Sequence, residues 1–442
     1  MLSREQNERL TRVDRTQPAG EVLRRYWQPV ALADELARER PVVPVTLLGE
    51  RLVLFRDDDG ELGLLDRHCP HRGADLCQAR LEDNGLRCPF HGWHFDRTGQ
   101  CTDQPGEPTS SEAFTRLRTT SYPVVQKNGV VFAYLGPGDP PDFPHFDCFR
   151  APDSHVFVFK GLWQCNWLQA LEIGIDPAHA SFLHRFLEDE NPDKGYGQQF
   201  RDRADYIDMP MTQLLREYPR PDITVEETEF GLRLTALRHL PEDLTHVRVT
   251  NQIFPNAICI PMSREMTITQ WHVPVDDTHC YWYSMFTSFG GPVQKEVMRA
   301  QRLREHRLPD YAPLKNAENH YGYDSAEQQT TTFTGMGMDI NVHDQWAVES
   351  MGAVQDRTKE HLGATDVGII RYRKLLRRAI DQLAKQDETA LPMRGPTAAK
   401  ALTGPFANDT IADSSDWRAA SARADLNRRE QCPWDASIDT HN

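Results

Sequence analysis

Several features that would narrow the function of a chain are missing from this sequence of 442 residues. It has no apolar run close to the roughly 20 residues that a membrane-spanning helix needs, and its first residues show no signal-peptide pattern. It also lacks an excess of positive charge, because the formal net charge is -15, and such a charge repels nucleic acid backbones and anionic membranes. We therefore expect a cytoplasmic protein that binds neither nucleic acid nor membranes.

Cysteine is scarce and irregularly spaced. The nine cysteines are an odd number, and they lack the dense, even spacing of a secreted disulfide scaffold, so reduced thiols are expected. Only Cys69 and Cys88 have histidines at ligand spacing. The sequence contains no internal repeat and no low-complexity tract, and its length favours more than one domain.

Hydrophobic patterning predicts an α+β protein with two main domains. The β-hairpin signals of the first half include an Asn128-Gly129 turn, one of the strongest short hairpin signals. Three further strand-like segments in the second half predict an antiparallel sheet, and residues 366–385 have the apolar spacing of an amphipathic helix. The expected parts are a helical N-terminal arm (1–40, with helical stretches at 21–27 and 31–38), a β-rich domain (41–140), a second domain (141–385) and a surface-wrapping tail (386–442).

A first group of potential metal ligands lies in the β-rich domain. Cys69-Pro70-His71 and Cys88-Pro89-Phe90-His91 each supply one thiol and one imidazole. A two-iron, two-sulfide cluster of the Rieske type uses two thiolates on one iron and two imidazoles on the other. Tetrahedral zinc is the alternative, but zinc fingers usually pair Cys with Cys and His with His along the chain. The interleaved order favours the Rieske cluster.

A second group follows in the next domain, where Asp176, His179 and His184 are close in sequence. Two histidines and one carboxylate on a single iron leave positions open for dioxygen. Asp176-Pro177 is typical of a helix start, and the five-residue step between the histidines suggests a π-bulge. If the third ligand is a distant carboxylate, the candidates are Asp344, Glu349, Asp356 and Asp366.

Three segments resemble those of Rieske ring-hydroxylating oxygenases. CPHRGADL followed by LRCPFHGWHFDRTGQC is similar to their cluster-binding signature, and the Asp-x-x-His-x-x-x-x-His arrangement is similar to their mononuclear iron motif. QWAVESMGAVQDRTKEHLGATD resembles the corresponding segment of the phthalate 4,5-dioxygenase branch. The resemblance implies an all-β Rieske domain and a helix-grip catalytic domain, with Asp356 as the third iron ligand. It also implies that Asp176 is an electron bridge between the two metal centres, across a subunit interface.

The same resemblance implies a partner set. Members of this branch form trimers or stacked trimers of one subunit type, and they receive electrons from NAD(P)H through a reductase and sometimes a ferredoxin. Their substrates are phthalates, related aromatic acids or O-methylated aromatic acids. A carboxylate in a dry pocket needs a guanidinium partner, for which Arg248 is the first candidate, with Arg233 and Arg238 behind it.

Two alternatives to ring hydroxylation stay open on the sequence. The first is O-demethylation of a methoxylated aromatic acid, since it uses the same iron chemistry. The second, from another functional class, is a Rieske electron carrier whose second domain only binds a partner. The histidine motif at Asp176 to His184 favours an oxygenase over an electron carrier.

Overall fold

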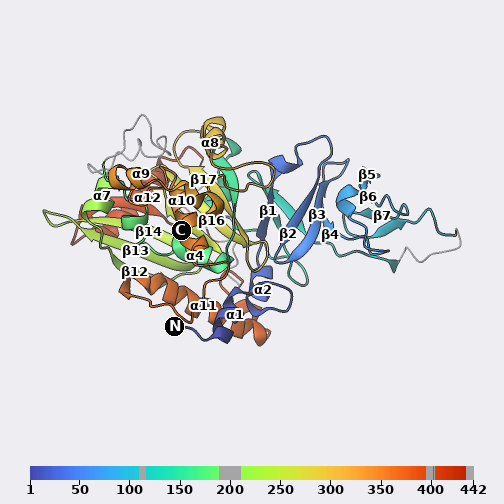
Figure 1. Cartoon of the computed structure of the whole chain (residues 1–442), viewed down its shortest axis with the longest axis horizontal. Coiled ribbons are helices and arrows are strands. Elements are labelled where there is room, and N and C mark those ends of the chain that lie inside the picture. Colours follow the sequence, from blue (N-terminus) through green and yellow to red (C-terminus); the bar gives the residue numbers. More distant parts are fainter. Residues whose placement is uncertain (109–115, 189–210, 395–401, 403, 435–442) are drawn as a thin grey trace.

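The computed structural model describes residues 1–108, 116–188, 211–394, 402 and 404–434. The molecule is elongated, with a large part built around one broad sheet and a narrow part made of small sheets at the other end (Figure 1). This arrangement agrees with the expected α+β class. Among the described residues, no helix combines the length and the apolar character needed to span a membrane.

The narrow part consists of three antiparallel sheets, ordered β2-β3-β4, β5-β6-β7-β8 and β1-β10-β9. Their strands are β1 (Gln28–Leu32), β2 (Val42–Leu47), β3 (Glu50–Arg56), β4 (Leu62–Asp66), β5 (Arg80–Glu82), β6 (Gly85–Arg87), β7 (His94–Asp96), β8 (Cys101–Asp103), β9 (Val124–Lys127) and β10 (Val130–Ala133).

The hairpins predicted for this part are confirmed. β3 and β4 pair on either side of the acidic segment Asp57-Asp58-Asp59-Gly60. β9 and β10 meet at Asn128 and Gly129, whose φ angles of 42° and 81° are those of a tight hairpin turn. The helix predicted at 31–38 is wrong, because β1 pairs with β10 and only the short 3-10 turn η1 (Ala33–Leu36) follows it. All five residues of β1 are buried, as in a strand covered on both faces.

The large part contains the antiparallel sheet that the sequence predicts. Its order is β11-β17-β16-β15-β14-β13-β12, and β18 also pairs with β14. The strands are β11 (Val156–Trp163), β12 (Asp222–Glu227), β13 (Gly231–His239), β14 (Leu244–Ile253), β15 (Ala257–Pro261), β16 (Met266–Pro274), β17 (Cys280–Ser288) and β18 (Asn408–Asp413).

Helices cover both faces of this sheet. α4 packs on β15, β16 and β17, α11 packs on β12 and β13, and α12 packs on β18 and β14 (Figure 1). The helices are α1 (Arg4–Thr11), α2 (Pro18–Arg24), α3 (Asp147–Arg150), α4 (Trp167–Gly174), α5 (Ala180–Leu183), α7 (Met211–Glu217), α8 (Lys295–Arg302), α9 (Ser325–Thr330), α10 (Ile340–Glu349), α11 (Val367–Ala384) and α12 (Trp417–Glu430). The amphipathic helix predicted at 366–385 is therefore confirmed as α11.

The C-terminal segment does more than wrap the surface, which corrects the prediction for 386–442. β18 pairs with β14 over six residues, from Leu244 opposite Asp413 to Val249 opposite Asn408. β18 thereby provides hydrogen-bond partners for the part of β14 that does not pair with β15. Residues 395–401, 403 and 435–442 of the predicted tail lie outside the described residues.

Two hydrophobic cores position the candidate sites. The larger core joins the arm, the inner sheets of the narrow part and the broad sheet of the large part. A smaller core lies beneath the cysteine loops and includes Cys69, Cys88, Leu86 and Phe95. The loops that carry the first ligand group thus rest on their own packed base.

Candidate metal centres

The two cysteine loops have the same backbone fold. In the first, the N–H of Cys69 donates to the carbonyl of Ala74 at 2.8 Å, and the N–H of Gly73 donates back to Cys69 at 2.8 Å. In the second, the N–H of Cys88 donates to the carbonyl of Trp93 at 2.9 Å, and the N–H of Gly92 donates to the carbonyl of Cys88 at 2.9 Å. The repetition explains how two short segments present equivalent ligands.

Glycine is required at the return point of each loop. Gly73 has φ of 79° and Gly92 has φ of 78°, a region that residues with a Cβ rarely adopt. A Cβ on Gly92 would also lie 2.7 Å from Cγ of Pro105. Both loops therefore depend on their glycines.

The four side chains of these loops form a layered site. Cys69 and Cys88 are each 2% exposed, and burial, together with the neighbouring thiol of Cys88, raises the pKa of Cys69 to about 11. The rings of His71 and His91 lie outside the thiols with centroids 4.4 Å apart, and Trp93 stacks on His71 at 4.3 Å. Two buried thiols below two imidazoles fit the donor set of a Rieske cluster, which supplies the cation that buried thiolates need.

A second set of ligand atoms converges in the large part. Nε2 of His179 lies 3.1 Å from Nε2 of His184. A carboxylate oxygen of Asp344 lies 3.2 Å from Nε2 of His184 and 3.7 Å from Nε2 of His179. The three ligand atoms all lie within 4.8 Å of one another, so the donor set fits a mononuclear iron.

The two histidines meet because α5 is only one turn long. His179 directly precedes the helix and His184 directly follows it, with φ of -103° and ψ of 21°. The predicted π-bulge is therefore wrong, since the chain leaves the helix at His184 instead of widening inside it. The end of the helix turns this side chain back toward His179.

Asp176 orients the first of these histidines. Its carboxylate accepts a hydrogen bond from the backbone N–H of Ala178 at 2.9 Å, as expected at a helix start. Its backbone carbonyl accepts from Nδ1 of His179, which leaves Nε2 directed at the ligand group. Burial and the neighbouring His184 lower the pKa of His179, which favours the neutral imidazole that binds metals.

Asp356, the carboxylate predicted from the resemblance, does not join the histidines. It is 49% exposed and pairs with Lys359 at 3.0 Å, and hydrogen bonds with Thr358 and Lys359 lower its pKa to about 2. We correct the third ligand to Asp344, which was among the four candidates. Asp344 lies on α10 beside the buried His343, whose ring stacks on His184 at 5.8 Å.

The other candidate carboxylates have structural partners. Glu349 accepts hydrogen bonds from the backbone N–H of Gln164 at 2.8 Å and from the hydroxyl of Tyr321 at 2.9 Å. Asp366 accepts from the N–H of Gly363 at 2.6 Å. These contacts leave Asp344 as the candidate that faces the histidines.

Arg248, predicted to hold a substrate carboxylate, is already paired. It donates to the carboxylate of Asp409 on β18, and to the carbonyl of Pro261 at 2.9 Å. Arg238 does contact the histidine motif, since it donates to Oγ of Ser181 at 3.2 Å. Arg233 lies on the opposite face of the sheet, over the ring of Phe406.

Arg238 is buried without a carboxylate of its own. It is 1% exposed, and its remaining donors reach the carbonyls of Tyr218 at 3.0 Å and Pro177 at 3.5 Å. Its Nη1 has no hydrogen-bond partner in the part of the chain that the structure describes. Burial and the nearby Arg248 lower the pKa of Arg238 to about 10, so the guanidinium stays charged at neutral pH.

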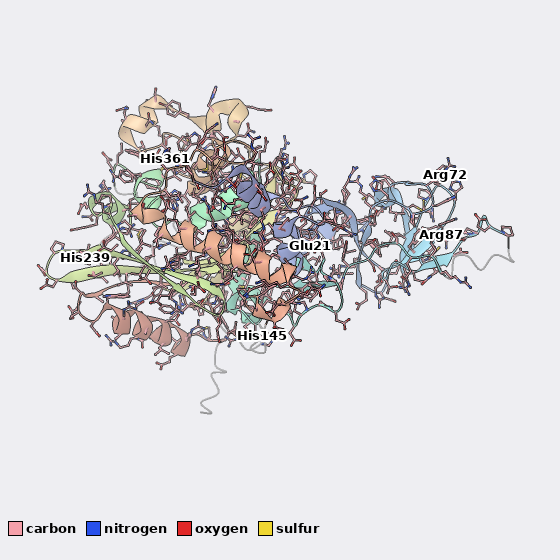
Figure 2. The ribbon with its side chains drawn as sticks, turned by 90° about the horizontal axis from the view of Figure 1, so that it is seen from below. Glu21, Arg72, Arg87, His145, His239 and His361 are labelled. Carbon is pink, nitrogen blue, oxygen red and sulfur yellow. The ribbon has the colours of Figure 1, made fainter. Side chains whose placement is uncertain are left out.

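A hollow of about 1130 Å³ opens beside Asp176 and His179. Its apolar lining includes side chains that are unusually exposed for their type, among them Phe182 (49%) and Trp346 (36%). Exposed apolar groups gathered around a site mark an interaction surface. His361 precedes Leu362, which lines the hollow, and Arg72 follows His71 in the first cysteine loop. Figure 2 shows His361 and Arg72 far apart along the long axis. The hollow is therefore distant from the cysteine loops of the same chain.

A buried charge network lies behind the hollow. Glu172 on α4 accepts hydrogen bonds from Arg357 at 2.8 Å and from Arg373 on α11 at 3.0 Å. Asn166 caps the start of α4 by accepting from the N–H of Leu168 at 3.1 Å. Both polar residues hold the helix that leads to Asp176.

Comparison with known families covers both parts of the chain. A Rieske [2Fe-2S] domain matches residues 26–123, and a domain described as LigXa C-terminal domain like matches residues 133–437. The second match includes β18 and α12, which agrees with the pairing of β18 in the catalytic sheet. These matches define a protein with an N-terminal iron-sulfur domain of the Rieske type and a larger C-terminal domain.

Relatives of known activity extend over nearly the whole chain. The phthalate 4,5-dioxygenase oxygenase subunit of Pseudomonas putida is 33% identical and covers 96% of this chain and 95% of its own. The 5,5'-dehydrodivanillate O-demethylase oxygenase subunit of a Sphingobium species is 30% identical and covers 92% and 87%. The chain belongs to the Rieske oxygenases, the enzymes that combine a [2Fe-2S] cluster with a catalytic mononuclear iron.

Solved structures share the fold. NdmA of Pseudomonas putida CBB5, in a mutant form with theobromine, superposes with a TM-score of 0.56 at 18% identity, covering 84% of this chain and 96% of that one. Dicamba monooxygenase bound to dicamba gives a TM-score of 0.54 at 18% identity, covering 82% and 99%. The predicted α+β fold class is therefore confirmed.

Proposed function

We propose that this chain is the terminal oxygenase of a multicomponent system that uses O2 and electrons from NAD(P)H to oxidise an aromatic carboxylate. The observation that carries the substrate class is Arg238, a buried guanidinium with an unpartnered Nη1 beside the histidine motif. A buried cation without a carboxylate is costly. A substrate carboxylate would supply the missing charge.

In this proposal, Cys69, His71, Cys88 and His91 hold the cluster. The catalytic iron is held by His179, His184 and Asp344, which replaces the predicted Asp356. When bound, an iron with two histidines and one carboxylate supplies open positions for dioxygen. The protein holds the ligand atoms in place through the carbonyl of Asp176 and the helix end at His184.

Arg238 orients the substrate. Its contacts with Ser181 and Pro177 fix the guanidinium against the segment that carries both histidines. A carboxylate bound there would turn the aromatic ring toward the iron ligands, and orientation of this kind is a large part of catalysis. Hydroxylation of a phthalate-like ring and O-demethylation of a methoxylated aromatic acid both fit this arrangement, and the named relatives include both kinds of enzyme.

We also propose a head-to-tail assembly, as trimers or stacked trimers. The hollow beside His179 has an exposed apolar rim, and the cluster loops of the narrow part expose Phe90 (54%) next to His91. The cluster loops and the hollow of one chain are far apart (Figure 2). A second copy of the chain would therefore bring its own cluster to the hollow. The carboxylate of Asp176 then lies between the two centres as the electron bridge.

The proposed donors are an NAD(P)H-dependent reductase and, in some systems, a ferredoxin. A cytoplasmic location fits this supply of electrons and the nine free, buried cysteines. A pure electron carrier is the weaker alternative, because it would not need the convergence of His179, His184 and Asp344.

Product analysis tests the proposed function directly. Protein loaded with iron and supplied with a surrogate reductase, NADH and O2 is given phthalates, benzoates and methoxybenzoates. We expect a diol or a demethylated phenol from at least one aromatic acid, and loss of that product in Arg238→Gln with both metal centres retained. Turnover only of uncharged aromatics, or full activity in Arg238→Gln, would refute the carboxylate assignment.

The bridge is tested by Asp176→Asn, because asparagine caps helices about as well as aspartate. We expect both metals and the assembly to persist, with normal reduction of the cluster but slow oxidation of the reduced cluster when substrate and O2 are added. Stopped-flow absorbance measures that step. Rapid oxidation coupled to product would leave Asp176 only as a helix cap.

A further inference from the structure

The side chains around Arg238 come from three strands of one sheet face. Arg238 on β13 is paired in register with His246 on β14, and Arg248 is paired with Asp409 on β18. Alternation along the strands places these four side chains on the same face. That face is turned toward α5, because Arg238 reaches Ser181 there.

Among the described residues, Asp409 is the one carboxylate that forms hydrogen bonds with this group. Asp409 accepts hydrogen bonds from Nη1 of Arg248 and from Nε2 of His246. Burial alone would raise the pKa of Asp409, but Arg248 and His246 lower it, so the carboxylate is ionised. Arg238 makes no hydrogen bond to Asp409, and its partners are all uncharged.

A charge count for the group follows from these contacts. The side chain of His246 is fully buried, and its Nδ1 has no partner. His246 supplies a hydrogen-bond donor to Asp409 but no negative charge. Arg248 and Asp409 cancel each other, and Arg238 is left as a cation that no carboxylate of the described residues pairs with.

We propose that the C-terminal strand β18 sets the substrate charge of this enzyme. Asp409 neutralises Arg248, and the site therefore accepts an aromatic acid with a single negative charge in preference to a dicarboxylate. The inference rests on the proposed function and makes it more specific, because it separates benzoate-type acids from phthalate-type acids. Asp409 is a positioning residue in this account, since it acts through Arg248.

The proposal predicts a different net charge of the site in the wild type and in each of two variants. The wild type carries one net positive charge, Asp409→Asn carries two, and Arg248→Gln carries none. The preferred ligand should change accordingly from a monoanion to a dianion or to a neutral molecule. Hydrogen bonds to charged groups contribute more free energy than hydrogen bonds between neutral groups. The difference is large enough to change the affinity for a ligand by about tenfold or more.

The probes are three molecules that differ mainly in charge: 3-methoxybenzoate, 5-methoxyisophthalate and 3-methoxybenzamide. Dissociation constants are measured by calorimetry on the anaerobic, iron-loaded protein at pH 7.5. We expect the wild type to favour the benzoate over the isophthalate by about tenfold. We expect Asp409→Asn to shift this ratio by about tenfold toward the isophthalate, and Arg248→Gln to remove the advantage of the benzoate over the benzamide.

Asp413→Asn is the matched control, because it makes the same charge change at an exposed position of the same strand. Its ligand preference should equal that of the wild type. A dicarboxylate preference in the wild type, or the same ratio in Asp409→Asn and Asp413→Asn, would overturn this inference while leaving the oxygenase proposal intact. If no aromatic acid binds or is turned over, both proposals fail together. The wild-type measurement needs no variant, so poor folding of Asp409→Asn would not block the test.

Discussion

Glu172 on α4 should stabilise the fold strongly, because two arginines form hydrogen bonds with it in the interior. Arg357 and Arg373 have side-chain exposures of 0% and 4%, and that of Glu172 is 6%. Removing one partner of a buried pair costs about 3 to 5 kcal/mol, since the remaining charge stays buried. Glu172→Gln keeps the shape of the side chain and removes its charge, so we expect a loss in this range.

The assay is thermal unfolding of the iron-loaded protein. For domains of this size, about 1 kcal/mol shifts the Tm by about 2 °C or more, so Glu172→Gln should lower the Tm by at least about 6 °C. The control is Glu227→Gln, which breaks an exposed pair with Arg378 at 2.7 Å and should cost less than about 1 kcal/mol. Equal, small shifts in the two variants would refute the reasoning.

The pH dependence of this difference follows from the pKa of Glu172. Burial alone would raise that pKa, but Arg357 and Arg373 lower it below its ordinary value of 4.5. A carboxylate whose pKa is lower in the folded state than in the unfolded state stabilises the folded protein. This contribution is complete at pH values above the pKa of the unfolded state, and it is lost as the pH falls through the pKa of the folded state. The Tm difference between wild type and Glu172→Gln should therefore be constant near neutral pH and shrink below about pH 4.5.

The remaining predictions concern the cluster loops and the assembly. Gly92→Ala should lower the cluster content measured by visible absorbance, because its Cβ would clash with Pro105. Gly60→Ala is the control, since Gly60 has a similar positive φ but open space around it, and this variant should keep the cluster. Equal absorbance in both variants would contradict the loop argument. Trp346→Glu places a charge on the exposed rim of the hollow and should reduce the mass measured by light scattering to that of one chain, and an unchanged assembly would remove the hollow from the interface.

Much of the fold was predictable because its signals are local. The Asn128-Gly129 turn and the period of α11 each depend on residues that are near one another in the sequence. The helix predicted at 31–38 failed because pairing of β1 with the distant β10 overrode local propensity. The place of β18 was equally hidden, since strand pairing between residues 247 and 410 leaves no local trace.

The metal ligands divide in the same way. The cluster loops and the pair His179 and His184 are short motifs, and their side chains converge as the spacing suggested. The third ligand lies more than 150 positions away. The choice between Asp344 and Asp356 depended on how α10 packs against α4, which brings Asp344 to the histidines. The pairing of Arg248 with Asp409 was invisible for the same reason.

The measurement that tests the central claim most directly is the iron content of Asp344→Ala and Asp356→Ala, both purified without oxygen. If His179, His184 and Asp344 hold the catalytic iron, Asp344→Ala should lose the iron in excess of the [2Fe-2S] cluster and all turnover, while its cluster spectrum stays normal. Asp356→Ala should keep both the iron and the activity, because its side chain pairs with Lys359 at the surface. Retention of the iron in Asp344→Ala and its loss in Asp356→Ala would contradict the site described here.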